Sequence, residues 1–282
     1  MVIKRFMGKL SVIIPSREDS FLVKTVVGLL ANAREEIEVI VVLDGYWPKD
    51  YVWNDVRVVV VHIGSDKNPL GMRACINAGV RVASGEYIMK LDEHCMVNEG
   101  FDVKLKASCK DNWVVVPRRY RLDAENWKII EDGRPPIDYM YIENKGGYLH
   151  GTIDKKRTEE RKDVLIDDLM TFQGSCYFMK KKFWEVIGPM DDVNYGPFAN
   201  EAQEIGLKAW LSGGRVVVNK TTWYAHWHRD RRGYKFTNEQ QRKFSESVAK
   251  GRTYSANYWL NNKWNKRIYD YRWLLDKFPR KE

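Results

Sequence analysis

The stretch Leu70–His94 reads LGMRACINAGVRVASGEYIMKLDEH, and it joins a helix to a strand through a short turn. Leu70–Ala83 is predicted to be a helix, which the turn residues Ser84-Gly85 end. Glu86–Leu91 is an apolar run of the length of a buried strand. The polar residues Asp92-Glu93-His94 follow it directly, so they belong at the carboxyl end of that strand.

The same alternation of strand and helix extends on both sides of this stretch. Phe21–Ala33 places apolar side chains on one helical face. Compact apolar runs predict further strands at Leu10–Ile14, Glu38–Leu43, Val56–Ile63 and Trp113–Pro117. Continuous apolar strands separated by helices are typical of a parallel sheet covered on both faces, so the fold class is α/β.

In such sheets ligands bind beyond the carboxyl ends of the strands. Three polar segments stand at those ends: Pro15 to Asp19, Asp44-Gly45 and Asp92 to His94. These segments are therefore the first candidates for a functional site.

The second half of the chain has a weaker pattern. Residues 118–168 are rich in charge, Gly and Pro, and no regular element is predicted there. Order is predicted again as strands at Thr171–Met179 and Arg215–Asn219, and as helices at Lys181–Ile187, Glu201–Ser212, Asn238–Lys250 and Trp264–Lys277.

Composition excludes several classes of protein. The 282 residues are 44% hydrophobic and 30% charged, as in a globular protein with a sizeable core. No apolar run approaches the roughly 20 residues that span a bilayer, and no secretory signal is evident, so we expect a cytoplasmic protein. The four cysteines show no C-x-x-C spacing and are expected to be reduced. A net charge of +9 favours acidic partners, although an ordinary basic surface explains it equally well.

Asp92 and His94 form a D-x-H pattern at a strand end. Their side chains offer a hard oxygen and an imidazole nitrogen, a set that suits Mn²⁺ or Mg²⁺. A divalent ion of this kind stabilises a departing diphosphate. Alone the pattern is weak, because an Asp or His at a strand end is more often a cap or a surface group.

The interpretation of Asp92 and His94 as metal ligands is strengthened by several segments that resemble, in the same order along the chain, those of a known family. Leu10–Asp19 resembles the opening strand of family 2 glycosyltransferases, and Asn68–Cys95 resembles the GT-A catalytic core. Within that core, Leu91-Asp-Glu-His-Cys95 is similar to the metal motif of polypeptide N-acetylgalactosaminyltransferases. Further similar segments are Gly174–Lys180, Phe183–Asp191, Asn200–Gly214 and Ala225–Arg229. The resemblance implies a GT-A fold, a Rossmann-like and mostly parallel sheet flanked by helices. It divides the chain into a catalytic domain, residues 1–230, and a helical, basic and aromatic-rich extension, residues 231–282.

The resemblance also implies roles for individual residues. Asp92, His94 and His226 would bind the metal, with His228 as a rival to His226. The donor, a nucleotide sugar and by resemblance a UDP-sugar, would contact Pro15, Ser16, Arg17, Glu18, Asp44, Arg73 and Asp92. On sequence alone Asp44 is also a turn residue, and Arg73 a solvated helix residue. The charged segment Lys145–Lys162 is a candidate lid over the donor.

Glu201 is the candidate catalytic carboxylate beside the acceptor, and Glu204, one helical turn on, is the alternative. In inverting relatives such a carboxylate is the general base, whereas in retaining relatives it positions the substrates. Phe198-Ala-Asn-Glu201 departs from the Trp-Gly-Gly-Glu of the retaining group and from the Glu-Asp pair of the inverting one. The stereochemistry therefore stays open. Both Glu residues are also compatible with an ordinary helix N-terminus.

The tail interleaves cations and rings, a combination that binds nucleic acid. The cations and rings are Arg252, Tyr254, Tyr258, Trp259, Lys263, Trp264, Lys266, Arg267, Tyr269, Tyr271, Arg272 and Trp273. We therefore predict, as acceptor, a hydroxyl of a modified base in DNA, which the enzyme would have to flip out. The aromatic residues of the tail are explained equally well if their rings pack on the core. The alternative to a DNA acceptor is a polysaccharide, lipid or protein acceptor. The alternative to an enzyme is a catalytically inactive module that binds nucleotides or nucleic acid.

Overall fold

The computed structural model describes residues 8–17, 20–48, 54–196, 198–228 and 238–279. One mixed sheet forms its centre, in the strand order β10-β12-β6-β11-β4-β1-β2-β3, with β5 paired to β12 and β7 paired to β6. The strands are β1 (Leu10–Ser16), β2 (Ile37–Asp44), β3 (Val58–Ile63), β4 (Tyr87–Leu91), β5 (Cys95–Val97), β6 (Trp113–Asp123), β7 (Lys128–Ile129), β10 (Ile166–Asp168), β11 (Cys176–Lys180) and β12 (Arg215–His226).

Strand direction places several strand ends at one edge of the sheet. β1 pairs in parallel with both β2 and β4, and β2 pairs in parallel with β3. β11 is antiparallel to β4 and to β6, so β6 runs in the direction of β4 again, and β12 is parallel to β6. The carboxyl ends of β1, β2, β4 and β12 therefore all point toward the same edge.

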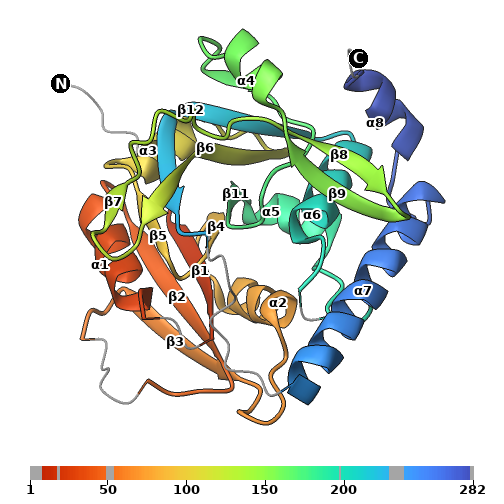
Figure 1. Ribbon diagram of the computed structural model, residues 1–282. Coiled ribbons are helices and arrows are strands. Elements are labelled where there is room, and N and C mark those ends of the chain that lie inside the picture. The colour runs from red at the N-terminus through yellow and green to blue at the C-terminus, as the bar shows by residue number, and fades with distance from the viewer. Residues whose placement is uncertain (1–7, 18–19, 49–53, 197, 229–237, 280–282) are drawn as a thin grey trace.

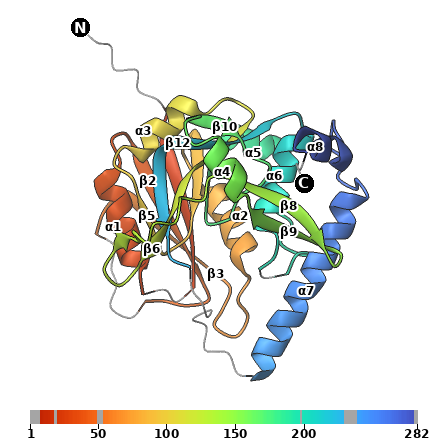
Figure 2. The ribbon, with the colours of Figure 1, turned by 45° about the horizontal axis from the view of Figure 1, so that its top comes forward.

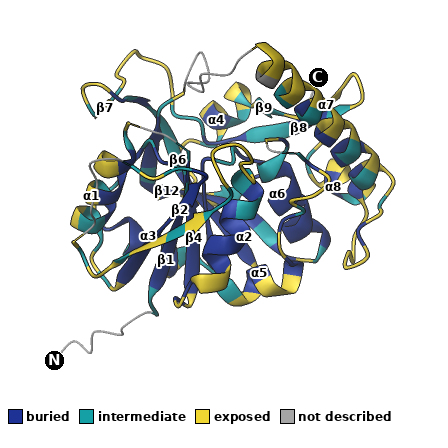
Figure 3. Ribbon diagram, turned by 90° about the horizontal axis from the view of Figure 1, so that it is seen from below, coloured by how far each residue is buried: buried dark blue, intermediate teal, exposed yellow. Residues whose placement is uncertain are grey.

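Helices cover both faces of this sheet, because successive strand side chains point to opposite faces. On β1, Val12 and Ile14 join the core under α1 (Leu22–Asn32) and α3 (Phe101–Ser108), while Ile13 joins the opposite core. That second core lies under α2 (Met72–Val82), α5 (Lys181–Ile187) and α6 (Glu201–Leu211). Figure 1 shows the two groups of helices on either side of the strands, and Figure 3 shows the central strands as the most deeply buried part. The predicted α/β class is confirmed.

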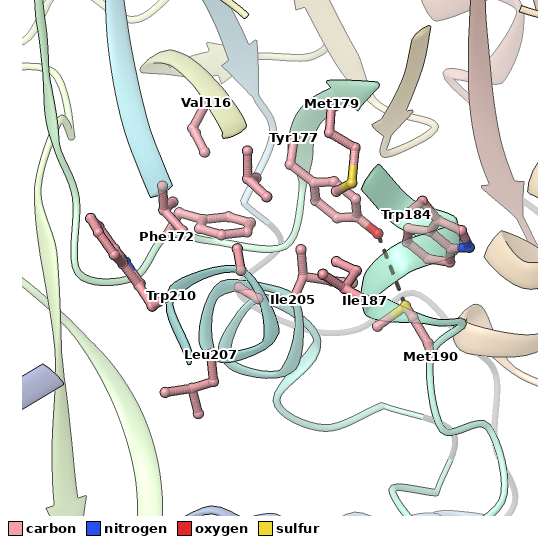
Figure 4. Close-up of a cluster of buried hydrophobic side chains, with 14 of the residues drawn as sticks. Val116, Phe172, Tyr177, Met179, Trp184, Ile187, Met190, Ile205, Leu207 and Trp210 are labelled. Carbon is pink, nitrogen blue, oxygen red and sulfur yellow. Dashed lines mark hydrogen bonds between the residues drawn. The ribbon is translucent and has the colours of Figure 1, made fainter. Parts of the chain in front are cut away.

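The larger core is built around α6. Ile205 and Trp210 of this helix belong to one cluster of buried side chains with Phe172, Tyr177 and Trp184 (Figure 4). The indole nitrogen of Trp210 donates a hydrogen bond to the Leu169 carbonyl, so even its polar atom is satisfied. This packing fixes the N-terminus of α6, and with it Glu201, relative to the sheet.

The middle of the chain is more regular than the sequence predicted. β6 continues to Asp123 and is followed by β7, by a hairpin of β8 (Met140–Lys145) and β9 (Tyr148–Ile153), by α4 (Lys155–Glu160) and by β10. The prediction of no regular element was wrong because these segments are mostly half-buried or exposed and rich in charge. They lack the apolar periodicity from which an element is predicted. The hairpin extends to α7, as Figure 2 shows.

The tail forms two helices, α7 (Asn238–Leu260) and α8 (Tyr271–Lys277). α7 is longer than predicted, and α8 begins at Tyr271 rather than near Trp264, with the side chain of Asp270 accepting a hydrogen bond from the Trp273 N–H. Trp259, Trp264 and Tyr271 are buried in the core that α6 also joins. The predicted domain boundary at residue 230 lies outside the described residues. Among the described helices, none combines the length and the apolar character needed to cross a membrane.

Candidate active site at the carboxyl edge of the sheet

Three ligand atoms converge where β4 ends and β12 ends. Asp92 and His94 follow β4, and the antiparallel pairing of β5 with β12 places Cys95 opposite His226. The Nε2 atom of His226 lies 3.1 Å from Oδ2 of Asp92 and 3.1 Å from Nε2 of His94. Among the described residues, these are the group of side chains that meets the geometry of a metal site.

The distances between these atoms fit a divalent ion. Ligands about 2.1 Å from an ion, at right angles to one another, lie about 3.0 Å apart. The third pair, His94 Nε2 and Asp92 Oδ2, is 4.0 Å apart, which corresponds to a wider angle at the ion. Two imidazole nitrogens and one carboxylate oxygen form a donor set that suits Mn²⁺ or a similar metal.

The protonation of the cluster also suits a metal. Burial lowers the pKa of His226 to about 4, although Asp92 acts in the opposite direction. His226 is therefore neutral at physiological pH, with a lone pair available on its ring. Burial alone would raise the pKa of Asp92, but Lys90 and the two histidines hold it well below its usual range. His228 is exposed, with its ring centroid 6.4 Å from that of His226, and it is not part of the cluster.

Lys90 connects the cluster to Glu201. Its fully buried ammonium lies 2.5 Å from Oδ1 of Asp92, 2.5 Å from the Gly174 carbonyl oxygen and 3.3 Å from Oε1 of Glu201. Burial acts to lower the pKa of Lys90, but the two carboxylates raise it, so the residue stays charged. The motifs in the sequence do not point to Lys90, although a lysine inside the apolar strand Tyr87–Leu91 is a signal that could have identified it.

Glu201 and Glu204 have different surroundings. Glu201 is the first residue of α6, and burial raises its pKa to about 6, against the effect of Lys90. A Cβ on Gly174 would lie 2.7 Å from its Oε2 atom, so the absence of a side chain at that position leaves room for this carboxylate. Glu204 is buried, and its carboxylate already has partners. It accepts a hydrogen bond from the Asp191 N–H and forms ion pairs with Lys208 and Arg73.

Arg73 is buried, not solvated, which corrects the simpler prediction from the sequence. Its Nε atom donates to Glu204 at 3.1 Å, and the guanidinium lies over the ring of Tyr195 at 4.2 Å. One of its nitrogens, Nη2, is buried and has no hydrogen-bond partner within the described part of the chain.

The predicted donor residues of β1 and β2 lie together at the same edge. Ser16 hydrogen-bonds the hydroxyl of Tyr46, and Nη1 of Arg17 is 3.9 Å from Oδ2 of Asp44. Asp44 also accepts hydrogen bonds of 2.8 Å from the Leu70 and Gly71 N–H groups, which ties the end of β2 to the N-terminus of α2. Pro15 is half-buried beside Ser16, and Glu18 lies outside the described residues.

A further residue of the strand-end motif anchors this edge. Glu93, between the two metal-ligand candidates, is buried, and its carboxylate accepts a 3.2 Å hydrogen bond from the Arg17 N–H. Its carbonyl oxygen accepts from the hydroxyl of Thr25, which in turn accepts from the Cys95 N–H. Glu93 thereby ties the loop after β1 to the loop that holds Asp92 and His94.

Comparison with known proteins identifies a family and relatives that are similar to this chain. The family described as glycosyl transferase family 2 matches residues 11–187. Polypeptide N-acetylgalactosaminyltransferase 5 of Caenorhabditis elegans is 24% identical over 233 residues, which cover 77% of this chain and 36% of that protein. Polypeptide N-acetylgalactosaminyltransferase 3 of Taeniopygia guttata is 22% identical over 211 residues, 72% of this chain and 33% of that protein. The chain thus spans about a third of the length of these relatives.

Two solved structures share the fold. GalNAc-T7, solved with UDP, GalNAc and Mn²⁺, superposes with a TM-score of 0.63 at 16% identity, over 86% of this chain and 48% of that one. TarS of S. aureus superposes with a TM-score of 0.55, also at 16% identity, over 78% of this chain and 37% of that one. The expected GT-A fold is confirmed.

Proposed function

This chain belongs to glycosyl transferase family 2, and on that premise we propose that it transfers a sugar from a UDP-sugar to an acceptor hydroxyl with the help of a divalent metal ion. The observation that supports the proposal most is the convergence of Asp92, His94 and His226 at the carboxyl edge of the sheet. An α/β sheet binds its ligands at this edge. GalNAc-T7, which shares the fold, was solved with UDP, GalNAc and Mn²⁺.

The residues around the cluster have complementary roles in this proposal. Mn²⁺ or Mg²⁺ held by Asp92, His94 and His226 would act as a Lewis acid on the departing diphosphate. Arg73 is held rigidly by Glu204 and Tyr195, and its unpartnered Nη2 can donate to a donor phosphate. Pro15, Ser16, Arg17, Glu18 and Asp44 are proposed to form the nucleoside pocket.

Glu201 is the proposed catalytic carboxylate. It is held beside the metal cluster by Lys90, and its raised pKa lies close to the pH at which a general base is most effective. Glu204 is a weaker candidate, because its carboxylate is already paired with Arg73 and Lys208 inside the protein.

The structure supports the predicted DNA acceptor with fewer features of the tail than the sequence did. Trp259, Trp264 and Tyr271 are buried, so their rings do not form a stacking surface for bases. Exposed cations of the tail remain, among them Arg252, Lys263, Lys266 and Arg272. A hydroxymethylated base in DNA therefore stays a prediction that rests on basic charge, and a polysaccharide, lipid or protein hydroxyl is the alternative.

Hydrolysis of the donor tests the proposal without knowledge of the acceptor. The protein is incubated with a panel of UDP-sugars and Mn²⁺, and release of UDP is measured for the unchanged chain and for Asp92→Ala. Slow hydrolysis that needs Mn²⁺ and is lost in the variant supports the transferase. No hydrolysis of any donor supports an inactive binding module instead. A donor identified in this way is then used to screen hydroxymethylated DNA against glycan, lipid and protein acceptors.

A further inference from the structure

Arg73 is held from two sides, and these contacts leave part of its guanidinium unused. On one side its Nε atom donates to Glu204 at 3.1 Å, and on the other its guanidinium carbon lies over the ring of Tyr195, 4.2 Å from the ring centroid. Nη2 is buried and has no hydrogen-bond partner among the residues that the structure describes. A buried N–H group without an acceptor is costly to a fold, so we expect a ligand to complete the contacts of Arg73.

Arg73 lies close to the candidate active site. It is the second residue of α2, and the N-terminus of this helix is tied to the end of β2 through Asp44. Burial raises the pKa of Glu201, while Lys90 and Arg73 both act to lower it, so the guanidinium is near that carboxylate as well. The unused N–H group of Arg73 is therefore placed where a donor phosphate would bind.

Tyr195 is itself held in place by α7, the long helix of the tail. The side chain is buried, and its hydroxyl accepts a 2.8 Å hydrogen bond from the indole nitrogen of Trp259. The ring of Tyr254 meets the Tyr195 ring edge-on, with the ring centroids 5.3 Å apart. Figure 1 shows α7 on the side of the sheet that α2 and α6 cover. Tyr195 thus connects the tail to Arg73.

The backbone of the Tyr195 segment also approaches α7 closely. A Cβ on Gly251 of α7 would overlap the Tyr195 carbonyl oxygen, and a Cβ on Gly196 would lie 2.8 Å from the hydroxyl oxygen of Ser247. Gly196 has a φ of 68°, in the left-handed region that favours glycine. Ser247 and Gly251 are four residues apart, so they lie on one side of the helix, and the buried Ser255 continues that side. The position of Tyr195 is therefore fixed by the surface of α7.

We propose that Tyr195 is a positioning residue, which α7 holds against Arg73 so that Nη2 is directed at a phosphate of the donor. The inference rests on the proposed transferase function, in which Arg73 contacts that phosphate. An arginine side chain has about 2 kcal/mol of rotamer entropy, and a side chain that is already ordered loses less of it on binding. The ring of Tyr195 and the carboxylate of Glu204 provide this order in advance. α7 thereby contributes to donor binding through Tyr195, without a contact of its own with the donor.

Calorimetric titration of UDP in the presence of Mn²⁺ tests this role through a double-mutant cycle. We expect Arg73→Gln to weaken UDP binding at least tenfold and Tyr195→Leu to weaken it at least threefold. In the Arg73→Gln background, Tyr195→Leu should cause no further loss, because the ring acts through Arg73. Tyr195→Phe keeps the ring and should bind UDP within twofold of the unchanged protein.

A change in the helix tests the same connection from the other side. Gly251→Ala should weaken UDP binding at least threefold, because the added Cβ forces α7 away from Tyr195. The control is Leu274→Ala, which removes a fully buried side chain of α8 and should lower the melting temperature without a change in UDP affinity. Thermal melting checks that each variant is folded. If Tyr195→Leu does not fold, Gly251→Ala takes its place in the cycle.

Three results overturn the inference and leave the proposed function in place. They are UDP binding that is unaffected by Arg73→Gln or by Tyr195→Leu, a threefold further loss in the Arg73→Gln background, and an equal loss in the control Leu274→Ala. The last would show that UDP affinity follows general stability. Failure of the unchanged protein to bind UDP with Mn²⁺ is a separate result, which refutes the proposed function and the inference with it.

Discussion

Replacement of Lys90 by Met is expected to destabilise the protein in a way that depends on pH. The buried ammonium lies between two carboxylates, 2.5 Å from Asp92 and 3.3 Å from Glu201. Removal of one partner from a buried ion pair costs about 3–5 kcal/mol. Asp92 keeps its contact with His226 and its side chain is 20% exposed, so we expect the lower end, about 3 kcal/mol at pH 7.5.

The pH dependence follows from Glu201. Its pKa is already raised to about 6 in the folded protein, and it must rise further without Lys90, which acts to lower it. A raised carboxyl pKa means that ionisation opposes folding. The cost is therefore fully present above the folded pKa, declines as the pH falls below that value, and is gone below the pKa of the unfolded chain. The deficit of the variant should therefore shrink by at least about 1 kcal/mol between pH 7.5 and pH 5, since each pKa unit is worth about 1.4 kcal/mol.

Urea denaturation at the two pH values measures this effect, and Lys106→Met is its matched control. Lys106 is also a fully buried lysine, paired at 2.9 Å with Glu35, but it lies on α3 away from the metal cluster. Lys106→Met should lower the free energy of unfolding, but this loss should not shrink in the same way between pH 7.5 and pH 5. Equal deficits for Lys90→Met at both pH values, or no deficit at pH 7.5, would refute the reasoning.

Three further results are expected. The kcat/KM of donor turnover should fall about tenfold per pH unit below pH 6 as Glu201 takes up a proton, and a pH profile of Glu201→Gln should lack this limb. Gly174→Ala should lower turnover at least tenfold while the melting temperature changes little, because a Cβ would lie 2.7 Å from Glu201 Oε2 and displace that flexible side chain. Trp259→Ala should lower the free energy of unfolding by about 3–5 kcal/mol in urea titrations, because the indole is buried and donates to Tyr195; a loss below about 1 kcal/mol would show that the tail is not part of the core.

The buried part of the fold could be predicted from the sequence because its strands are continuous apolar runs. β1, β2 and β4 were placed within a few residues, and so were α1, α2 and α6. The hairpin of β8 and β9 could not be predicted, because its strands are stabilised by pairing with each other and by contacts with distant segments such as α7. β12 extends seven residues beyond its predicted end at Asn219, past an irregularity in its pairing with β6.

The candidate site was predictable in part for a similar reason. Asp92 and His94 follow an apolar strand directly, so their position at the sheet edge follows from local sequence. The choice between His226 and His228 depends on where β12 ends and on its pairing with β5, which is tertiary information. The sequence shows Lys90 as a lysine inside an apolar strand, but its contact with Glu201, far away in the chain, is also tertiary information.

The central claim is that Asp92, His94 and His226 hold a metal ion that binds the donor diphosphate. Calorimetric titration of UDP, with and without Mn²⁺, tests it most directly when His226→Ala is compared with His228→Ala. We predict that the unchanged protein and His228→Ala bind UDP only with Mn²⁺, and that His226→Ala binds it at least tenfold more weakly. UDP binding that needs no metal, or an equal loss in the two variants, would contradict the claim.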